Sequence, residues 1–205
     1  MVQQNLSSII YKEYRPIVFS GGAIGVDSIA EECSDELGVL INIISFEKHI
    51  TGCKSEHRIN ISEILLKDAR KRVIAVKRKL GRPFPTKNPY SDALIERDYY
   101  QIRDSLQVFA FTRFDGSGKI ADGTAWAVEM AKEREIAIFL YDLDRHCWYR
   151  FSYYKHIGWV PLAPSIIYGN LTIIGTTELN EVESREVKNQ IQKILTALII
   201  NVKWK

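Results

Sequence analysis

The sequence has few cysteines, and its histidines show no metal-binding spacing. Its 205 residues include 3 cysteines and 4 histidines, with no CxxC, HxxxH or HExxH pattern. A structural zinc site would need such clustered ligands. A disulfide-stabilised secreted domain would need more cysteines, in an even number. The composition therefore predicts a protein of a reducing compartment, the cytoplasm, without a metal site.

Long apolar runs and a strong excess of charge are also lacking. No run approaches the ~18 residues of a membrane span, and MVQQNLSSII lacks the basic and apolar regions of a secretory signal. Lys and Arg number 28 against 25 Asp and Glu, a net charge of +3. A protein that functions by binding polyanions non-specifically would usually carry a larger net positive charge. With 46% hydrophobic residues, the chain can build a full core, and we expect no membrane partner.

Short β-rich apolar runs alternate with helical patterns along the chain. Near-continuous apolar strands separated by helices are typical of a parallel sheet covered on both faces. We therefore expect a single α/β domain over 1–205 with a doubly wound, mainly parallel sheet. The expected strands cover 16–20, 39–46, 106–112, 136–142 and 171–174.

Three further segments complete the predicted architecture. Residues 56–80 are expected to form one long helix, with Leu65 on its apolar stripe, that ends before a proline-rich turn. Ser91 is expected to cap a helix that runs to about Asp104. Residues 145–165 alternate aromatic and polar side chains, which predicts a β-hairpin added to the main fold.

Three glycine-containing corners follow predicted strands and open predicted helices. In a parallel sheet such corners meet beyond the carboxyl ends of the strands, where ligands bind. Glycine allows close backbone approach, and the first N–H groups of each helix favour a phosphate. A single glycine in such a corner is often needed only for the backbone conformation of the turn. Three such corners together favour nucleotide binding. The corner residues are Ser20, Gly21, Gly22, Ala23, Gly25 and Asp27; Gly116, Ser117, Gly118, Gly123 and Thr124; and Gly175, Thr176, Thr177 and Glu178.

The residues of these corners resemble a known family. SGGAIGVDSIAEE is similar to the GGAxGxD motif of the SLOG superfamily, in its YpsA-like branch. ERDYYQIRDSLQVFAF and DGSGKIADGTAWAVEMAKEREIAIFL resemble two further segments of that branch. LTIIGTTELNE resembles the turn that normally opens the fold, so the chain resembles a circularly permuted member. The resemblance covers about 16–46, 91–142 and 170–198.

The resemblance implies a Rossmann-like sheet that binds a nucleotide or a nucleotide-derived ligand such as ADP-ribose. Molybdenum cofactor carrier-like proteins and Lonely Guy phosphoribohydrolases have related folds. The resemblance also implies that Arg97 faces the ligand, and that 171–174 lie parallel to 17–19 with Gly175 beside Gly21. A side chain at Gly22 would then block the ligand while the protein stays folded.

The sequence departs from the family pattern at three places. The usual Arg-Asn is Arg97-Asp98 here, and Thr176-Thr177 replaces a Ser-Arg pair. The glutamate of the Lonely Guy motif is replaced by Ala127. Glu129 lies two residues after Ala127, which corresponds to a rotation of about 200° around a helix. Its side chain should therefore point away from the three corners. These departures favour a binding protein, such as a sensor or carrier, over a hydrolase.

Two other functions and an assembly state remain open from the sequence. An N-glycosidic hydrolase would need a carboxylate, and the candidates are Glu129, Asp115, Asp122 and Glu178. A nucleic-acid-binding protein would use the basic segment 67–82, although such runs are more often solvated helix faces. The apolar C-terminal segment and the aromatic hairpin predict a homodimer. The basic residues are Lys67, Arg70, Lys71, Arg72, Lys77, Arg78, Lys79 and Arg82.

Overall fold

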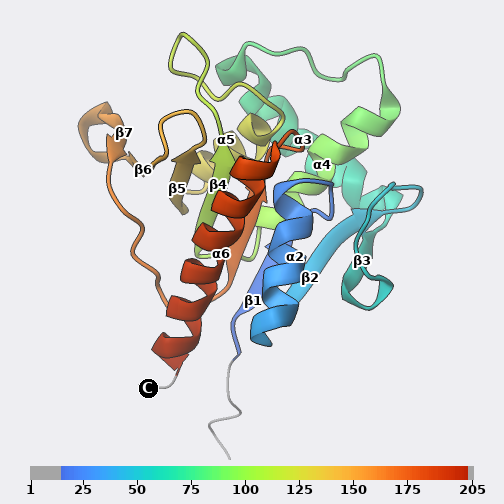
Figure 1. Ribbon diagram of the computed structural model, residues 1–205. Coiled ribbons are helices and arrows are strands. Elements are labelled where there is room, and N and C mark those ends of the chain that lie inside the picture. The colour runs from blue at the N-terminus through green and yellow to red at the C-terminus, as the bar shows by residue number, and fades with distance from the viewer. Residues whose placement is uncertain (1–14, 203–205) are drawn as a thin grey trace, which may run out of the picture.

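An eight-stranded mixed sheet forms the centre of the computed structural model, which describes residues 15–202 (Figure 1). The strand order is β3-β2-β1-β8-β4-β5-β6-β7. All pairs from β3 to β5 are parallel, and β6 and β7 are antiparallel. The predicted α/β fold with a mainly parallel sheet is confirmed. The strands are β1 (Ile17–Ser20), β2 (Leu40–Phe46), β3 (Arg58–Ile61), β4 (Gln107–Thr112), β5 (Ala137–Asp142), β6 (Cys147–Ser152), β7 (Gly158–Pro161) and β8 (Leu171–Gly175).

The last strand of the described chain lies in the middle of the sheet. Leu171 of β8 pairs with Val18 of β1 on one side and with Gln107 of β4 on the other. The predicted parallel placement of 171–174 beside 17–19 is confirmed. A Cβ atom at Gly175 would lie 2.6 Å from the side chain of Val26, so Gly175 lies beside the first corner, to which Gly21 also belongs.

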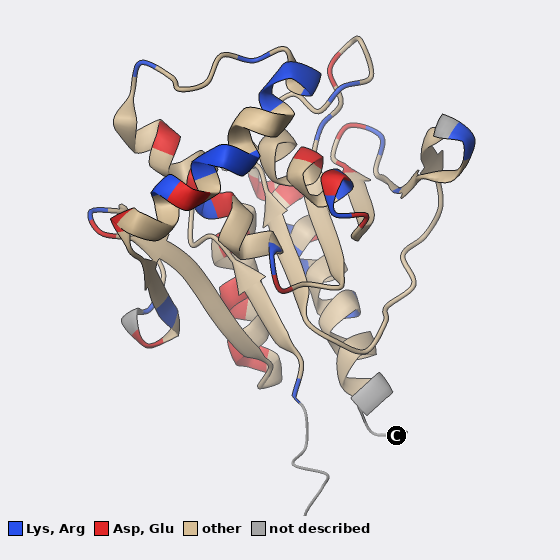
Figure 2. Cartoon of the chain, turned by 180° about the vertical axis from the view of Figure 1, so that it is seen from behind, with Lys and Arg blue, Asp and Glu red and all other residues tan. Residues whose placement is uncertain are grey.

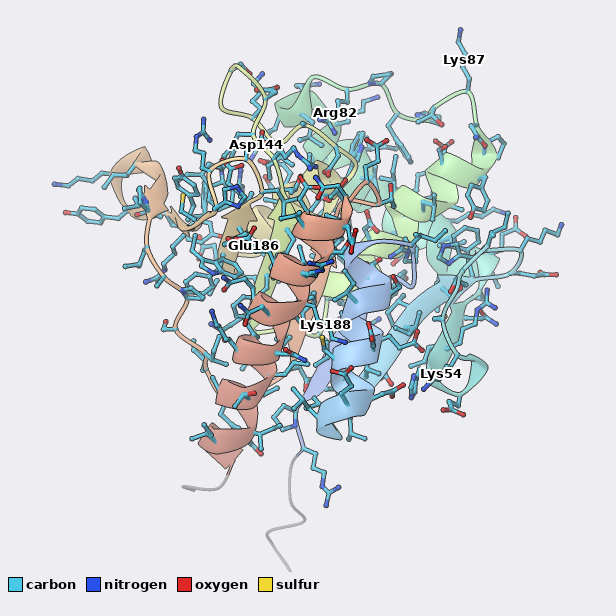
Figure 3. The ribbon with its side chains drawn as sticks, viewed as in Figure 1. Lys54, Arg82, Lys87, Asp144, Glu186 and Lys188 are labelled. Atoms are coloured by element: carbon cyan, nitrogen blue, oxygen red, sulfur yellow. The ribbon has the colours of Figure 1, made fainter. Side chains whose placement is uncertain are left out.

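Helices cover both faces of the sheet. On one face α2 (Val26–Leu37) packs against α6 (Glu181–Val202), and Lys188 lies between them with ion pairs to Glu32 and Glu36 (Figure 3). On the other face lie α3 (Glu63–Leu80), α4 (Pro89–Ile102) and α5 (Thr124–Glu133) (Figure 2). In the described residues 15–202 no helix combines the length and the apolar character that a membrane span requires.

The alternation of side chains along β4 shows how the two halves of the core form. Phe109 and Phe111 pack with α2 and α6, whereas Val108 and Ala110 pack with α3 and α5. All four are fully buried, as expected for a strand covered on both faces. Leu198, in the apolar C-terminal segment, is also buried within the chain. Part of the apolar segment on which the homodimer prediction rests therefore belongs to the core of the single chain.

The helix predicted over 56–80 is wrong at its start. Residues 58–61 instead form β3, an edge strand that pairs in parallel with β2. The Ser62 side chain then accepts from the N–H of Leu65 at 3.4 Å and caps α3. The branched side chains of Ile59 and Ile61 suit a strand. Leu66, with Ala69, Val73 and Val76, forms the buried face of α3, whereas Leu65 is 42% exposed.

Two other boundaries differ from the sequence predictions. α4 begins at Pro89, and the Asn88 side chain caps it by accepting from Tyr90 N–H at 3.0 Å. Proline at the first helical position needs no hydrogen-bond acceptor, so Ser91 lies inside the helix. The hairpin at 145–165 is confirmed, but it extends the sheet through β5 and β6 rather than standing apart from it.

Candidate functional site

The three predicted corners meet at the carboxyl edge of the parallel strands. Val26 N–H, at the start of α2, donates to the Thr176 carbonyl at 3.2 Å, and Thr176 N–H donates to the Phe111 carbonyl at 3.0 Å. A Cβ atom at Gly25 would lie 2.5 Å from the Thr176 oxygen, and one at Gly175 would lie 2.3 Å from the Phe111 oxygen. These two glycines therefore let the corners pack against one another.

A cleft of about 390 Å³ opens between these corners and α4. Side chains of α4, α5 and the β8–α6 turn surround it, with Leu94, Ile95 and Trp126 as apolar wall residues. The predicted site residues that line it are Ala23, Asp27, Arg97, Asp122, Gly123, Thr124, Gly175, Thr176, Thr177 and Glu178. The cleft also includes Ser91 and Asp98, which the sequence analysis did not select as ligand contacts.

The remaining predicted site residues do not line this cleft. Gly22 is buried, has φ +71°, and a Cβ there would lie 2.4 Å from Ile43. A valine at Gly22 would therefore strain the fold, and the expectation that it only blocks a ligand is wrong. The cleft lining does not include Ser20, Gly21 or Gly25, and Asp115, Ser117, Gly118 and Glu129 line a second cavity. Gly116 is exposed in the same loop.

A buried cluster of opposite charges forms the floor of the cleft. Arg97 of α4 is 4% exposed, Asp27 of α2 is 3% exposed, and Asp98 is 8% exposed. One guanidinium nitrogen of Arg97, Nη1, donates to Gln101 Oε1 at 2.6 Å and lies 3.4 Å from Asp98 Oδ1. Gly21 makes room for this group, because a Cβ there would lie 1.6 Å from the same nitrogen.

The cluster is not fully satisfied by hydrogen bonds. Asp27 accepts from Ala23 N–H at 3.3 Å through Oδ2, which fixes the glycine loop. Its other oxygen, Oδ1, and the Nε of Arg97 are buried and have no hydrogen-bond partner within residues 15–202. Buried polar groups are nearly always paired in folded proteins, so these two atoms make the cluster a candidate for contacts with a ligand.

Burial sets the protonation of the two carboxyl groups. It raises the pKa of Asp27 from 3.8 to about 6, although the charge of Arg97 lowers it in part. It raises the pKa of Asp98 from 3.8 to about 7; Arg97 lowers that value, and the nearby Asp27 raises it. Near neutral pH the pair can therefore both donate and accept protons. Perturbed carboxyl groups in a cleft are typical of binding and catalytic sites.

The first N–H groups of the helices around the cleft are bonded within the chain. In α2, Val26 N–H donates to the Thr176 carbonyl at 3.2 Å, without a side-chain cap. Thr124 N–H donates to Asp122 Oδ1 at 2.9 Å, and Glu183 N–H donates to Asn180 Oδ1 at 3.0 Å. Four acidic side chains line the cleft, against the single cation Arg97. The floor therefore suits hydroxyl and N–H donors better than a phosphate.

The basic segment 67–82 is largely engaged within the chain. Four of its side chains form ion pairs with carboxylates, among them Arg70 with buried Glu96 and Lys79 with Glu133. Arg82 donates to the backbone carbonyls of Ile120, Ala121 and Asp122. Arg82 therefore holds the β4–α5 loop, which carries Asp122 into the cleft. No group of three or more His, Cys, Asp or Glu within 15–202 is arranged to hold a metal ion.

Comparisons with known proteins give one structural likeness. No protein-family model matches the chain, and no curated protein matches it significantly. The crystal structure of a "Putative molybdenum carrier protein" from Syntrophus aciditrophicus is similar in fold, with 11% sequence identity and a TM-score of 0.46. The match covers 90% of this chain and 95% of that chain.

Proposed function

We propose that the cleft binds a nucleotide or a nucleotide-derived ligand, and that the protein acts as a sensor or carrier of it. The buried cluster of Asp27, Arg97 and Asp98 carries this proposal, because two of its polar atoms lack partners beside a cleft. The cleft volume of about 390 Å³ is within the range of small-ligand pockets, roughly 300–1,000 Å³. Its position matches the ligand edge of open α/β sheets.

In this proposal, each part of such a ligand lies against a wall of matching chemistry. Ribose hydroxyls would donate to the carboxyl groups of Asp27 and Asp98 at the floor. A base would lie along the apolar wall formed by Leu94, Ile95 and Trp126. The phosphate would lie at the mouth near exposed Thr177, where a hydroxyl donor is available away from the acidic floor.

A matched pair of Asp→Asn variants tests this proposal by calorimetry with adenosine, AMP and ADP-ribose. Asp27→Asn keeps the side-chain shape but removes a charged acceptor, so binding should weaken about tenfold or more. Asp115→Asn lies outside the cleft and should leave binding unchanged. Equal affinities of the native protein and Asp27→Asn, or an equal loss in both variants, would contradict the assignment of the cleft.

A hydrolase remains the second candidate, favoured by the raised pKa values of two carboxyl groups in one cleft. A protonated carboxyl can act as a general acid and its ionised neighbour as a base. Asp27 and Asp98 would then carry the reaction, because theirs are the pKa values that burial raises. Of the other carboxylate candidates, Asp122 and Glu178 also line this cleft, whereas Glu129 and Asp115 line another cavity. Release of ribose 5-phosphate from AMP, lost on Asp98→Asn, would establish the enzyme; binding without release would establish the binding protein.

A further inference from the structure

A second cavity lies on the opposite side of α5 from the candidate site. Its volume is about 490 Å³. The end of α3, the 115–120 loop, α5 and the hairpin β6–β7 enclose it. Ala125, Glu129 and Lys132 of α5 face this cavity, whereas Thr124 and Trp126 face the first cleft. The cavity is therefore separate from the site described above.

One wall of this cavity is aromatic. Phe151 and Trp159 pair directly across the hairpin, and their rings make an edge contact at 5.2 Å between centroids. Phe114 supports Trp159 from behind at 5.7 Å. The Lys132 ammonium lies 4.4 Å from the Phe151 ring centre and 5.3 Å from that of Trp159. Such a wall offers a flat apolar surface beside a positive charge.

The opposite wall carries two cations, Arg82 and Lys119, that form no ion pair with a residue of 15–202. Four cations (Lys79, Arg82, Lys119 and Lys132) and two acids (Asp115 and Glu129) line the cavity. Lys79 and Lys132 are paired with Glu133 and Glu129. Arg82 binds only backbone carbonyls. Asp115 is occupied by the N–H groups of Ser117 and Lys119 at 2.8 and 2.9 Å.

We propose that this second cavity binds a small aromatic anion, with its ring on Trp159 and Phe151 and its negative group toward Arg82 and Lys119. The volume fits one small molecule rather than a polymer. On the rest of α3, Lys67, Arg70 and Lys71 are paired with acids, which does not favour an extended polyanion. Charge-assisted hydrogen bonds to the anion would fix its orientation.

Phenyl phosphate is a suitable probe, followed through the indole N–H signals of the tryptophans by NMR. Trp159→Phe identifies the Trp159 signal by its disappearance. Phenyl phosphate should shift this signal saturably, whereas inorganic phosphate or phenol alone should bind about tenfold more weakly or worse, because each lacks one of the two contacts. An unshifted Trp159 signal, or equal binding of phosphate or phenol, would overturn the proposal.

Two charge-reversal variants distinguish binding in the second cavity from a general attraction of the anion to the positively charged protein. Lys119→Glu should weaken phenyl phosphate binding about tenfold. Lys87→Glu changes the net charge equally, but Lys87 projects away from the rest of the molecule (Figure 3), so binding should be retained. Equal losses in the two variants would overturn the proposal. Asp27→Asn should leave this binding unchanged, so failure here and failure of the first cleft are distinguishable.

Discussion

Replacement of Arg97 by alanine is expected to lower the free energy of unfolding by about 3–5 kcal/mol at pH 8, the usual cost of breaking a buried ion pair. The variant leaves Asp27 and Asp98 buried without their cation. At pH 5 both carboxyl groups bind protons and are neutral, so the loss should be much smaller. Urea unfolding at the two pH values measures the difference.

The sign of this pH dependence follows from the raised pKa values. A carboxyl group whose pKa rises on folding binds more protons in the folded protein, so its contribution to stability is lost as pH rises. For Asp27 and Asp98 the loss extends from about pH 4 through the folded values of about 6 and 7. Removal of Arg97 raises both values and steepens this decline. Arg103→Ala, at the exposed end of α4, is the control, and a pH-independent loss in Arg97→Ala would contradict the assignment.

Replacement of Gly25 by alanine is expected to destabilise the protein by about 3 kcal/mol or more, because positive-φ strain adds to overpacking. Gly25 has φ +94°, and its added Cβ would lie 2.5 Å from the Thr176 oxygen and 2.8 Å from Thr177 Cα. Both neighbours are backbone atoms, so neither can rotate away. The first and third corners would separate, and thermal unfolding would show the change.

Gly116→Ala provides the matched control for this substitution. Gly116 is exposed, and its added Cβ would have no neighbour within 4 Å. Its unfolding free energy should change by less than about 1 kcal/mol, as for most surface substitutions. If Gly25→Ala were as stable as Gly116→Ala, the close packing of the corners would be wrong.

The main strands could be predicted from the sequence because each is a short, apolar, β-branched run. The strand β3 could not, because Ile61 continues the apolar spacing of the following helix, and only pairing with β2 distinguishes the two. The start of α4 carried a readable signal in Asn88-Pro89, a cap followed by proline, which the choice of Ser91 overlooked.

The candidate site was predictable in position but not in detail. Parallel topology alone places the corners at one edge of the sheet. Which glycines face a cleft depends on contacts distant in sequence, such as that between Gly25 and Thr176. Asp98 could have been found, because Ser91, Leu94 and Asp98 recur at helical spacing on one face of α4, and all three line the cleft.

The central position of β8 constrains how the chain can fold during synthesis. A ribosome releases β1 and β4 long before residues 171–175, yet both strands need β8 as their neighbour. Until then the nascent protein holds two half-sheets with unpaired inner edges, which are prone to association with other chains. The dependence on contacts between distant residues also slows folding. Chains stopped before Leu171 should therefore engage chaperones, whereas chains that include α6 should close the sheet.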